Sequence, residues 1–145
     1  MSKLQWSDDL AVGVELIDRE HKELFSRIDA LLQAMAKGQG KAEVVKVIDF
    51  LERYVVIHFS DEESLMLSVK YPGYAAHKLL HTAFIRDVAA LKADLAAHGA
   101  NAALAIRAQQ ELSGWLVNHI RQVDTKLAAF VKAAAPAGQT RASHS

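Results

Sequence analysis

The sequence predicts an all-α protein that folds as an up-down-up-down antiparallel four-helix bundle with an N-terminal arm. Its 145 residues include only two prolines and seven glycines, so few positions interrupt a helix. Between these positions, apolar residues recur at spacings of three and four, which is the period of an amphipathic helix. Long helices joined by short connections pack as antiparallel neighbours, and this predicts the bundle.

Helix-ending residues place the four helices along the chain. The expected helices cover residues 18–37, 41–69, 74–98 and 101–134. Asp18 is the expected N-cap of the first helix, and the glycines at 38 and 40 fit its end and the following turn. Pro72 disfavours helix in the residue before it and so ends the second helix. Gly99 ends the third helix, and Asn101 is the expected N-cap of the fourth.

The domain organisation follows from these boundaries. Residues 1–134 are expected to form one domain, in which Trp6 docks the N-terminal arm over the bundle. Residues 135–145 contain Pro136 together with Gly, Ser and Thr, and we expect them to form a flexible tail. We expect no second full-sized domain in a chain of this length.

Composition excludes several functions. The chain carries 17 Lys and Arg against 17 Asp and Glu, and no basic run replaces the missing net charge, so no binding to nucleic acid is expected. No stretch of about 18 apolar residues occurs, so we expect no membrane insertion and a cytoplasmic protein. Cysteine is absent, which excludes disulfides and thiolate sites. Any metal must therefore be held by nitrogen and oxygen ligands.

Polar residues interrupt each predicted apolar stripe near one end of the bundle. Five histidines and two carboxylates continue these stripes: His21, His58, Glu62, His77, His81, His119 and Asp124. In an antiparallel bundle, their positions along the helices all lie at the same end. Buried carboxylates without partners are costly, and buried imidazoles require partners as well. The sequence therefore predicts a cluster of cations bound by these seven side chains.

Four other polar residues are not assigned to this site. His98 stands at a helix end beside Gly99 and His144 stands in the tail, and neither continues a stripe. Asp61 and Glu63 flank Glu62 in the sequence but point off its stripe, so we expect both to be solvated.

The fourth helix poses a geometric problem. Its predicted stripe consists of Leu112, Leu116, His119, Val123, Leu127 and Phe130, with Ile120, Asp124 and Val131 on an adjoining apolar row. His119 and Asp124 are five residues apart and would point about 140° apart on an ideal α-helix. Either a wide apolar face accommodates both, or a π-bulge brings them into line. The sequence leaves both arrangements open.

The sequence carries a set of ordered motifs: Trp6, Gly13, Asp18-x-x-His21, His58-Phe59-x-x-Glu62-Glu63 with Met66, Tyr71-Pro72, His77-x-x-x-His81-x-x-Phe84 and Trp115-Leu116-x-x-His119-x-x-x-x-Asp124. This set resembles the hemerythrin family, and within it the single-domain bacterial members. The resemblance covers nearly all of residues 1–134. Each motif is weak alone, but the complete ordered set is specific.

This resemblance implies a non-haem di-iron centre with two Fe ions per chain. By the resemblance, His77, His81 and His119 ligate one iron, and His21 and His58 ligate the other. Glu62 and Asp124 bridge the two irons together with an oxo or hydroxo group. The iron with two histidines keeps an open position, at which dioxygen binds reversibly. Phe84, Trp115 and the aliphatic residues Leu24, Val55 and Leu116 are expected to wall the site against water.

The resemblance implies a dioxygen-binding protein, not an enzyme, for storage, transport or delivery to an oxygen-consuming enzyme. Two bridging carboxylates and the absence of any Glu-x-x-His motif also favour binding over oxidation chemistry. The alternatives are a di-iron oxidase or peroxidase, a two-metal hydrolase, an O2 sensor and an iron-handling module. The oligomeric state is left open.

Overall fold

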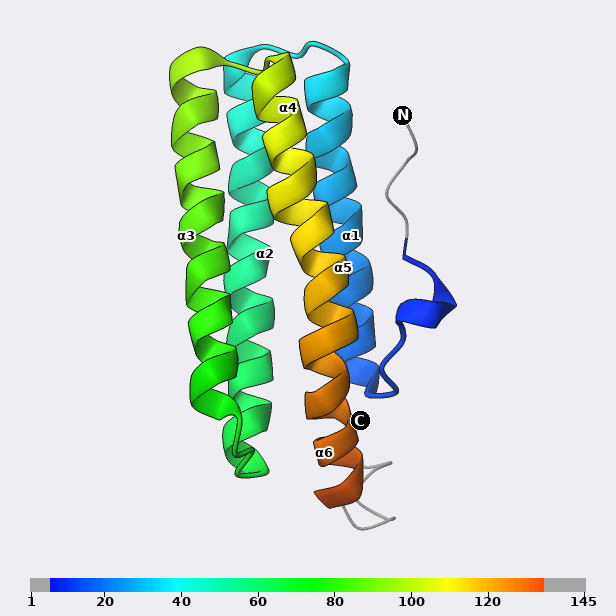
Figure 1. Ribbon diagram of the computed structural model, residues 1–145. Helices are drawn as coiled ribbons and strands as arrows, with labels where there is room; N and C mark the ends of the chain where they lie inside the picture. The colour runs from blue at the N-terminus through cyan, green and yellow to red at the C-terminus, as the bar shows by residue number, and fades with distance from the viewer. Residues whose placement is uncertain (1–5, 135–145) are drawn as a thin grey trace.

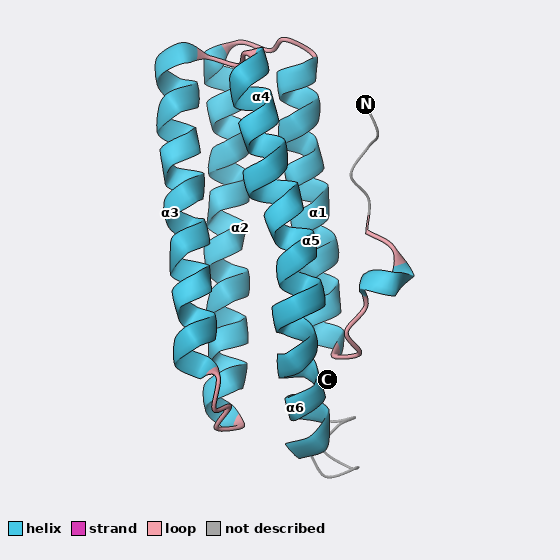
Figure 2. Cartoon of the chain, viewed as in Figure 1, coloured by secondary structure: helices cyan, strands magenta, loops and turns pink. Residues whose placement is uncertain are grey.

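The computed structural model describes residues 6–134, which form four helical rods lying side by side (Figures 1 and 2). The first three rods are single helices, α1 (Glu15–Ala36), α2 (Lys41–Ser68) and α3 (Tyr74–His98). The fourth is one continuous rod of five segments: α4 (Ala102–Ala108), the π-helix η2 (Gln109–Gly114), α5 (Trp115–His119), the π-helix η3 (Ile120–Asp124) and α6 (Thr125–Ala134). Successive rods run in opposite directions, so the predicted up-down-up-down bundle is confirmed. The predicted tail, residues 135–145, lies outside the described residues.

The helix ends at the α3–α4 connection follow the predicted chemistry. Gly99 has φ of 71°, a left-handed conformation that glycine adopts without steric cost and that ends α3. The side-chain oxygen of Asn101 accepts a hydrogen bond from the Leu104 N–H at 2.9 Å. Asn101 therefore caps α4 as predicted, because it satisfies one of the N–H groups that the first turn leaves without an acceptor.

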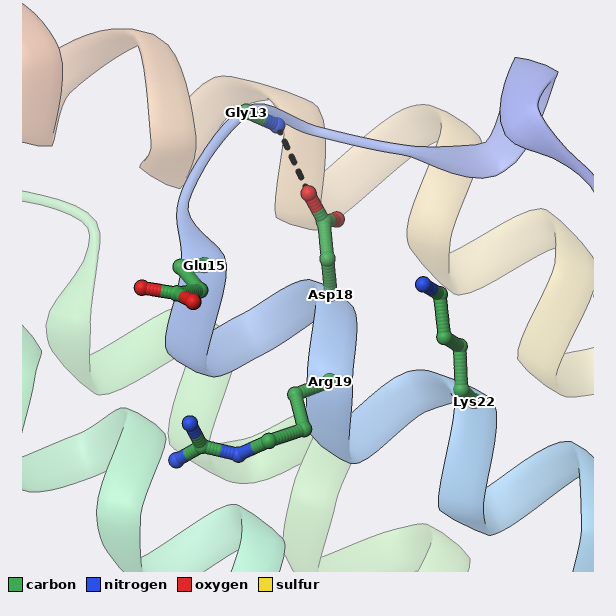
Figure 3. Close-up of a pocket in the computed structure, with 5 residues that line it drawn as sticks. All are labelled: Gly13, Glu15, Asp18, Arg19 and Lys22. Carbon is green, nitrogen blue, oxygen red and sulfur yellow. Dashed lines mark hydrogen bonds between the residues drawn. The ribbon is translucent and has the colours of Figure 1, made fainter. Parts of the chain in front are cut away.

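The start of α1 differs from the prediction. The helix begins at Glu15 with Val14 as its N-cap, so Asp18 lies inside the helix and does not cap it. Its carboxylate instead accepts hydrogen bonds from the N–H groups of Val12 at 2.8 Å and Gly13 at 3.1 Å, and the second of these is drawn in Figure 3. Asp18 thus holds Val12 and Gly13 in place where the chain turns into α1.

The N-terminal arm packs against the bundle. It contains the short 3-10 helix η1 (Asp8–Leu10), and the side chains of Leu10 and Val12 are buried in the hydrophobic core. Lys132 of α6 donates a hydrogen bond to the Val12 carbonyl at 2.8 Å. Trp6 also packs against the core. The predicted docking of the arm is therefore confirmed, and it joins the start of α1 to the end of the fourth rod.

The π-helix η3 resolves the spacing of His119 and Asp124. A π-helical turn holds more residues than an α-helical turn, so both side chains are buried and His119 Nε2 lies 3.3 Å from Asp124 Oδ1. From η3 onward, the buried residues of the rod are Ile120, Asp124, Leu127, Ala128 and Val131. The predicted adjoining row of Ile120, Asp124 and Val131 is therefore confirmed. Val123 and Phe130 of the predicted stripe are only half-buried, so the stripe is wrong at these two positions.

Hydroxyl side chains accompany both π-helical segments. Ser113 in η2 donates to the Gln109 carbonyl at 2.7 Å, and Thr125, directly after η3, donates to the Arg121 carbonyl at 2.8 Å. Both bonds reach the carbonyl four residues earlier, where a π-turn disturbs the regular backbone pattern. These hydroxyls supply donors at the two places where the fourth rod departs from α-helical geometry.

The core divides into two chemically different halves. Where α1 meets α2 and α3 meets α4, it is aliphatic and includes Leu31, Val44, Ile48, Leu91 and Leu95, all at 0% exposure. The opposite half, toward the end that lies at the bottom of Figure 1, holds the buried histidines and carboxylates. Among the described residues, no helix is long and apolar enough to cross a membrane.

We expect Asp18→Ala to lower the free energy of unfolding by about 1–2 kcal/mol, because two hydrogen bonds to a carboxylate are lost. Urea unfolding followed by circular dichroism measures this effect. Asp8→Ala is the matched control, since Asp8 is an acidic residue of the neighbouring arm whose side chain makes no hydrogen bond among the described residues. Equal stability of the two variants would contradict the role of Asp18.

Candidate metal centre

The structure brings together the seven side chains that the sequence singles out. All are buried, with exposures between 0% and 4%: His21, His58, Glu62, His77, His81, His119 and Asp124. They come from α1, α2, α3 and the fourth rod, at the end of the bundle where α2 connects to α3. Their nitrogen and oxygen atoms form two groups of possible metal ligands, one with three histidines and one with two. The two groups share Glu62.

Each oxygen of Glu62 faces a different group of histidines. Oε1 lies 3.0 Å from His77 Nε2 and 3.1 Å from His81 Nε2. Oε2 lies 3.2 Å from His58 Nε2 and 3.8 Å from His21 Nε2. Glu62 therefore spans the space between the two groups.

Asp124 spans the same two groups from the fourth rod. Its Oδ1 lies 3.1 Å from His77 Nε2 and 3.3 Å from His119 Nε2, while its Oδ2 lies 3.1 Å from His21 Nε2. Both carboxylates thus present one oxygen to the three-histidine group and the other to the two-histidine group. This arrangement fits two cations that share two bridging carboxylates.

Several of these buried atoms are without a hydrogen-bond partner among the described residues. They are both oxygens of Glu62, both oxygens of Asp124, both ring nitrogens of His21, His77 Nδ1 and His81 Nε2. Burying such groups unpaired costs several kcal/mol in all. Metal ions would satisfy the carboxylate oxygens and the Nε2 atoms together, and imidazole with carboxylate is a donor set that suits first-row transition metals such as iron. The residues present therefore fit the metal pair that the motifs imply.

Two further carboxylates, Glu20 and Glu63, bond to the outer nitrogens of these histidines. Glu20 Oε1 lies 2.8 Å from His58 Nδ1, and Glu63 Oε2 lies 2.9 Å from His81 Nδ1. Such contacts fix the orientation of a ligating imidazole and direct its other nitrogen to the metal. The prediction that Glu63 is solvated is wrong, because its side chain turns toward α3 and is only 19% exposed.

Sequence reasoning also missed Glu20, which is 6% exposed. A signal was present, because Glu20 follows Ile17 by three residues and precedes Leu24 by four, so it continues an apolar row. An acidic residue on such a row needs a buried partner, and His58 is that partner. The two carboxylates support one histidine in each group.

The buried charges shift the pKa values of the site. Burial alone would lower the pKa of His58, but the hydrogen bond with Glu20 and the nearby carboxylate of Glu62 outweigh it and raise this pKa to about 10. Burial would likewise lower the pKa of His77, but contacts with Asp124 and Glu62 outweigh it and raise this pKa to about 9. Burial would raise the pKa of Glu62, but the facing imidazoles hold it well below its usual range. Without metal, both imidazoles therefore carry protons at neutral pH, and metal binding has to displace them.

Aromatic rings cover the three-histidine group. Phe59 stacks on His81 with ring centroids 3.7 Å apart, and Trp115 stacks on His119 at 4.3 Å. Phe84 also stacks on Trp115, with ring centroids 4.1 Å apart. The aliphatic residues predicted as walls are buried as well: Leu24, Val55 and Leu116. This apolar surround limits the access of water to the polar cluster.

Comparisons with known proteins agree with the motifs. Residues 12–131 match the family model described as the hemerythrin HHE cation binding domain. The chain is 39% identical over 133 residues to a bacteriohemerythrin of Stenotrophomonas maltophilia (strain R551-3), covering 92% of this chain and 84% of that protein. It is 33% identical over 122 residues to a myohemerythrin of Theromyzon tessulatum, covering 84% and 88%. A solved structure of wild-type hemerythrin superposes with a TM-score of 0.78 at 30% identity, covering 90% of this chain and 98% of that one.

We expect Glu63→Ala to weaken metal binding by about 10- to 100-fold, because His81 loses the partner that orients it. Glu63→Gln should lose less, since its amide oxygen can still accept the hydrogen bond. Anaerobic titration with ferrous iron against a competing chelator measures the affinity. Glu43→Ala, at an exposed position on the same helix, is the control. Equal affinities of the Glu63→Ala and Glu43→Ala variants would show that Glu63 does not support the site.

Proposed function

Because the chain belongs to the hemerythrin family, we propose that it binds dioxygen reversibly at a non-haem di-iron centre. The observation that carries this proposal is the way in which Glu62 and Asp124 each span the two histidine groups. Two shared carboxylates would hold two metal ions side by side. A bound iron pair supplies the two electrons with which dioxygen is held reversibly.

The proposed ligand assignment follows the two groups of side chains. His77, His81 and His119 hold one iron, and His21 and His58 hold the other, with Glu62 and Asp124 shared. The two-histidine group offers one protein ligand fewer than the three-histidine group. We therefore propose that dioxygen binds on the side of His21 and His58.

The remaining residues of the site favour binding over oxidation. Phe59, Phe84 and Trp115 keep water from the three-histidine group, and Leu24 and Val55 belong to the buried core around the site. Exclusion of water protects a reduced metal pair from side reactions. The named relatives are hemerythrins, and we propose that this chain likewise acts without enzymatic turnover, in storage, transport or delivery of dioxygen to an oxygen-consuming enzyme.

A di-iron oxidase or peroxidase remains the second candidate, since it could use the same ligands. The observation that favours an oxidase or peroxidase is the presence of two additional carboxylates, Glu20 and Glu63, beside the proposed ligands. Neither side chain faces the centre directly, because each bonds to a histidine Nδ1. We therefore favour the dioxygen carrier, and the two candidates differ in their consumption of a reductant.

Metal analysis combined with absorption spectroscopy tests the proposal. We expect two irons per chain and an absorption band that appears when air reaches the reduced protein, disappears under vacuum and returns over several cycles. Glu62→Ala should lose most of the iron, because both histidine groups lose a shared ligand, whereas the exposed Glu43→Ala control should keep it. One metal per chain, or steady consumption of a reductant in place of a stable adduct, would contradict the proposed function.

A further inference from the structure

A second apolar row runs along α2, outside the stripe that the bundle core buries. It consists of Val47, Phe50, Tyr54 and Ile57, and we call it the outer row. Its members are spaced by three and four residues, and each directly precedes a residue of α2 that is at most 1% exposed. Successive residues of a helix point about 100° apart, so the outer row lies on the flank of α2. Phe50 and Ile57 are 57% and 52% exposed there.

Arg27 of α1 holds the centre of the outer row in place. Its guanidinium carbon lies 3.9 Å from the ring centroid of Phe50 and 4.6 Å from that of Tyr54. Its Nη1 donates to the Phe50 carbonyl at 2.9 Å, and its Nε donates to Glu23 at 2.6 Å. An exposed aromatic ring that is already ordered loses little entropy when a partner covers it. Aromatic and arginine side chains are also enriched in protein interfaces.

Two opposite charges continue the line of the outer row. Lys46 lies four residues before Phe50, and Asp61 lies four residues after Ile57. Lys46 is exposed and Asp61 is partly exposed. The midpoint between positions 46 and 61 is therefore also the midpoint between positions 50 and 57. This surface is apolar at its centre, positive toward one end and negative toward the other.

Such a surface is complementary to itself when a second α2 lies antiparallel to the first. A two-fold axis through the shared midpoint places Phe50 against Ile57 of the second copy. The same axis places Lys46 against Asp61 of the second copy, and symmetry makes each contact twice. A parallel arrangement would bring each charge against its own kind, which is unfavourable. Charge complementarity therefore favours an antiparallel copy of this chain as the partner.

The other charges of this flank are compatible with that arrangement. Arg53 stands beside the axis, but Asp49 of the same helix pairs with it at 3.0 Å. Its charge is thus compensated within its own chain. Glu43, which lies 3.2 Å from Lys46, falls opposite the uncharged Ser64 of the second copy. No pair of unpaired like charges is brought together.

We propose that the outer row is the contact surface of a symmetric antiparallel dimer of this chain. Few residues take part, so the dimer is of the weak class, with a Kd on the order of 10 μM. The contact surface lies on the flank of α2, and the proposed metal ligands lie in the core. The dimer therefore does not depend on the use that the protein makes of its metal.

Sedimentation equilibrium of the iron-loaded protein over a concentration series tests the proposal. We expect a monomer–dimer equilibrium in the unaltered protein. Ile57→Glu should raise the Kd by about 100-fold, because an apolar contact is lost twice in a symmetric dimer. Ile106→Glu is the matched control, since Ile106 is 60% exposed on α4, and it should dimerise as the unaltered protein does. Equal Kd values for these two variants would overturn the proposal.

Charge reversal tests the register without changing the apolar contact. Lys46→Glu should raise the Kd by about tenfold at low salt, because a repulsion replaces an attraction at each end. Adding Asp61→Lys to this variant should restore most of the affinity. Lys126→Glu, at an exposed position of α6, is the control. A Kd that is the same for Lys46→Glu and Lys126→Glu would overturn the antiparallel register.

Crosslinking gives the direction independently, because the chain has no cysteine of its own. Positions 46 and 61 are about 22 Å apart along one helix, so a short bismaleimide can join them only between two chains. We expect covalent dimers from the variant with both Lys46→Cys and Asp61→Cys, and none from Lys46→Cys alone. Covalent dimers of the single variant would show a parallel contact and overturn the proposed arrangement.

Two further results would overturn the dimer itself. One is a protein that stays monomeric at every concentration. The other is a monomer that co-sediments with phosphatidylglycerol vesicles and loses this binding in Ile57→Glu, since the outer row would then contact a lipid surface. Iron content and circular dichroism are measured on every variant, so that a change in Kd is compared only between folded, equally loaded proteins.

Discussion

The burial of Glu62 and Asp124 among five imidazoles is the constraint on which the rest of this structure depends. Both carboxylates are at most 1% exposed, and the contacts with imidazoles keep their pKa values well below the usual range. An ionised pair at this depth is tolerable only when positive charge lies beside it. The histidines meet this need when protonated, and two metal ions would meet it better because every facing nitrogen could then donate electrons.

The wider charge balance shows how the surrounding residues support such a pair. Glu20 and Glu63 add two carboxylates to the two that face the centre. The four negative charges of these carboxylates would balance the four positive charges of two ferrous ions. Glu20 and Glu63 bond to His58 and His81, so they would adjust how strongly these imidazoles donate to a metal without being metal ligands themselves. In this way the site is rich in charge, although only two of the four carboxylates face the proposed metal positions.

The fold and most of the site could be predicted because both follow from helical periodicity. On α3 the predicted stripe from His77 to Leu95 is buried without exception, since a regular helix keeps the period of 3.6 residues. The fourth rod departs from this period at η2 and η3. The choice between a wide face and a π-bulge depends on packing against three other helices, which no local pattern records.

Contacts between helices account for the other differences. Glu63 looked solvated because it lies off the stripe of α2, but its partner His81 belongs to α3 and is 18 residues away in sequence. Asp18 resembled an N-cap because its side-chain chemistry suits one. It bonds to the arm instead, because the chain before α1 turns at Gly13, which has φ of 87°. Such pairings depend on three-dimensional proximity, and the sequence shows only the residue types that make them possible.

The most direct test of the central claim is anomalous diffraction at the iron absorption edge from crystals of the iron-loaded protein. Our account predicts two peaks, each within bonding distance of one oxygen of Glu62 and one oxygen of Asp124. One peak should be surrounded by His77, His81 and His119, and the other by His21 and His58. A single peak, or two peaks that do not share these carboxylates, would contradict it.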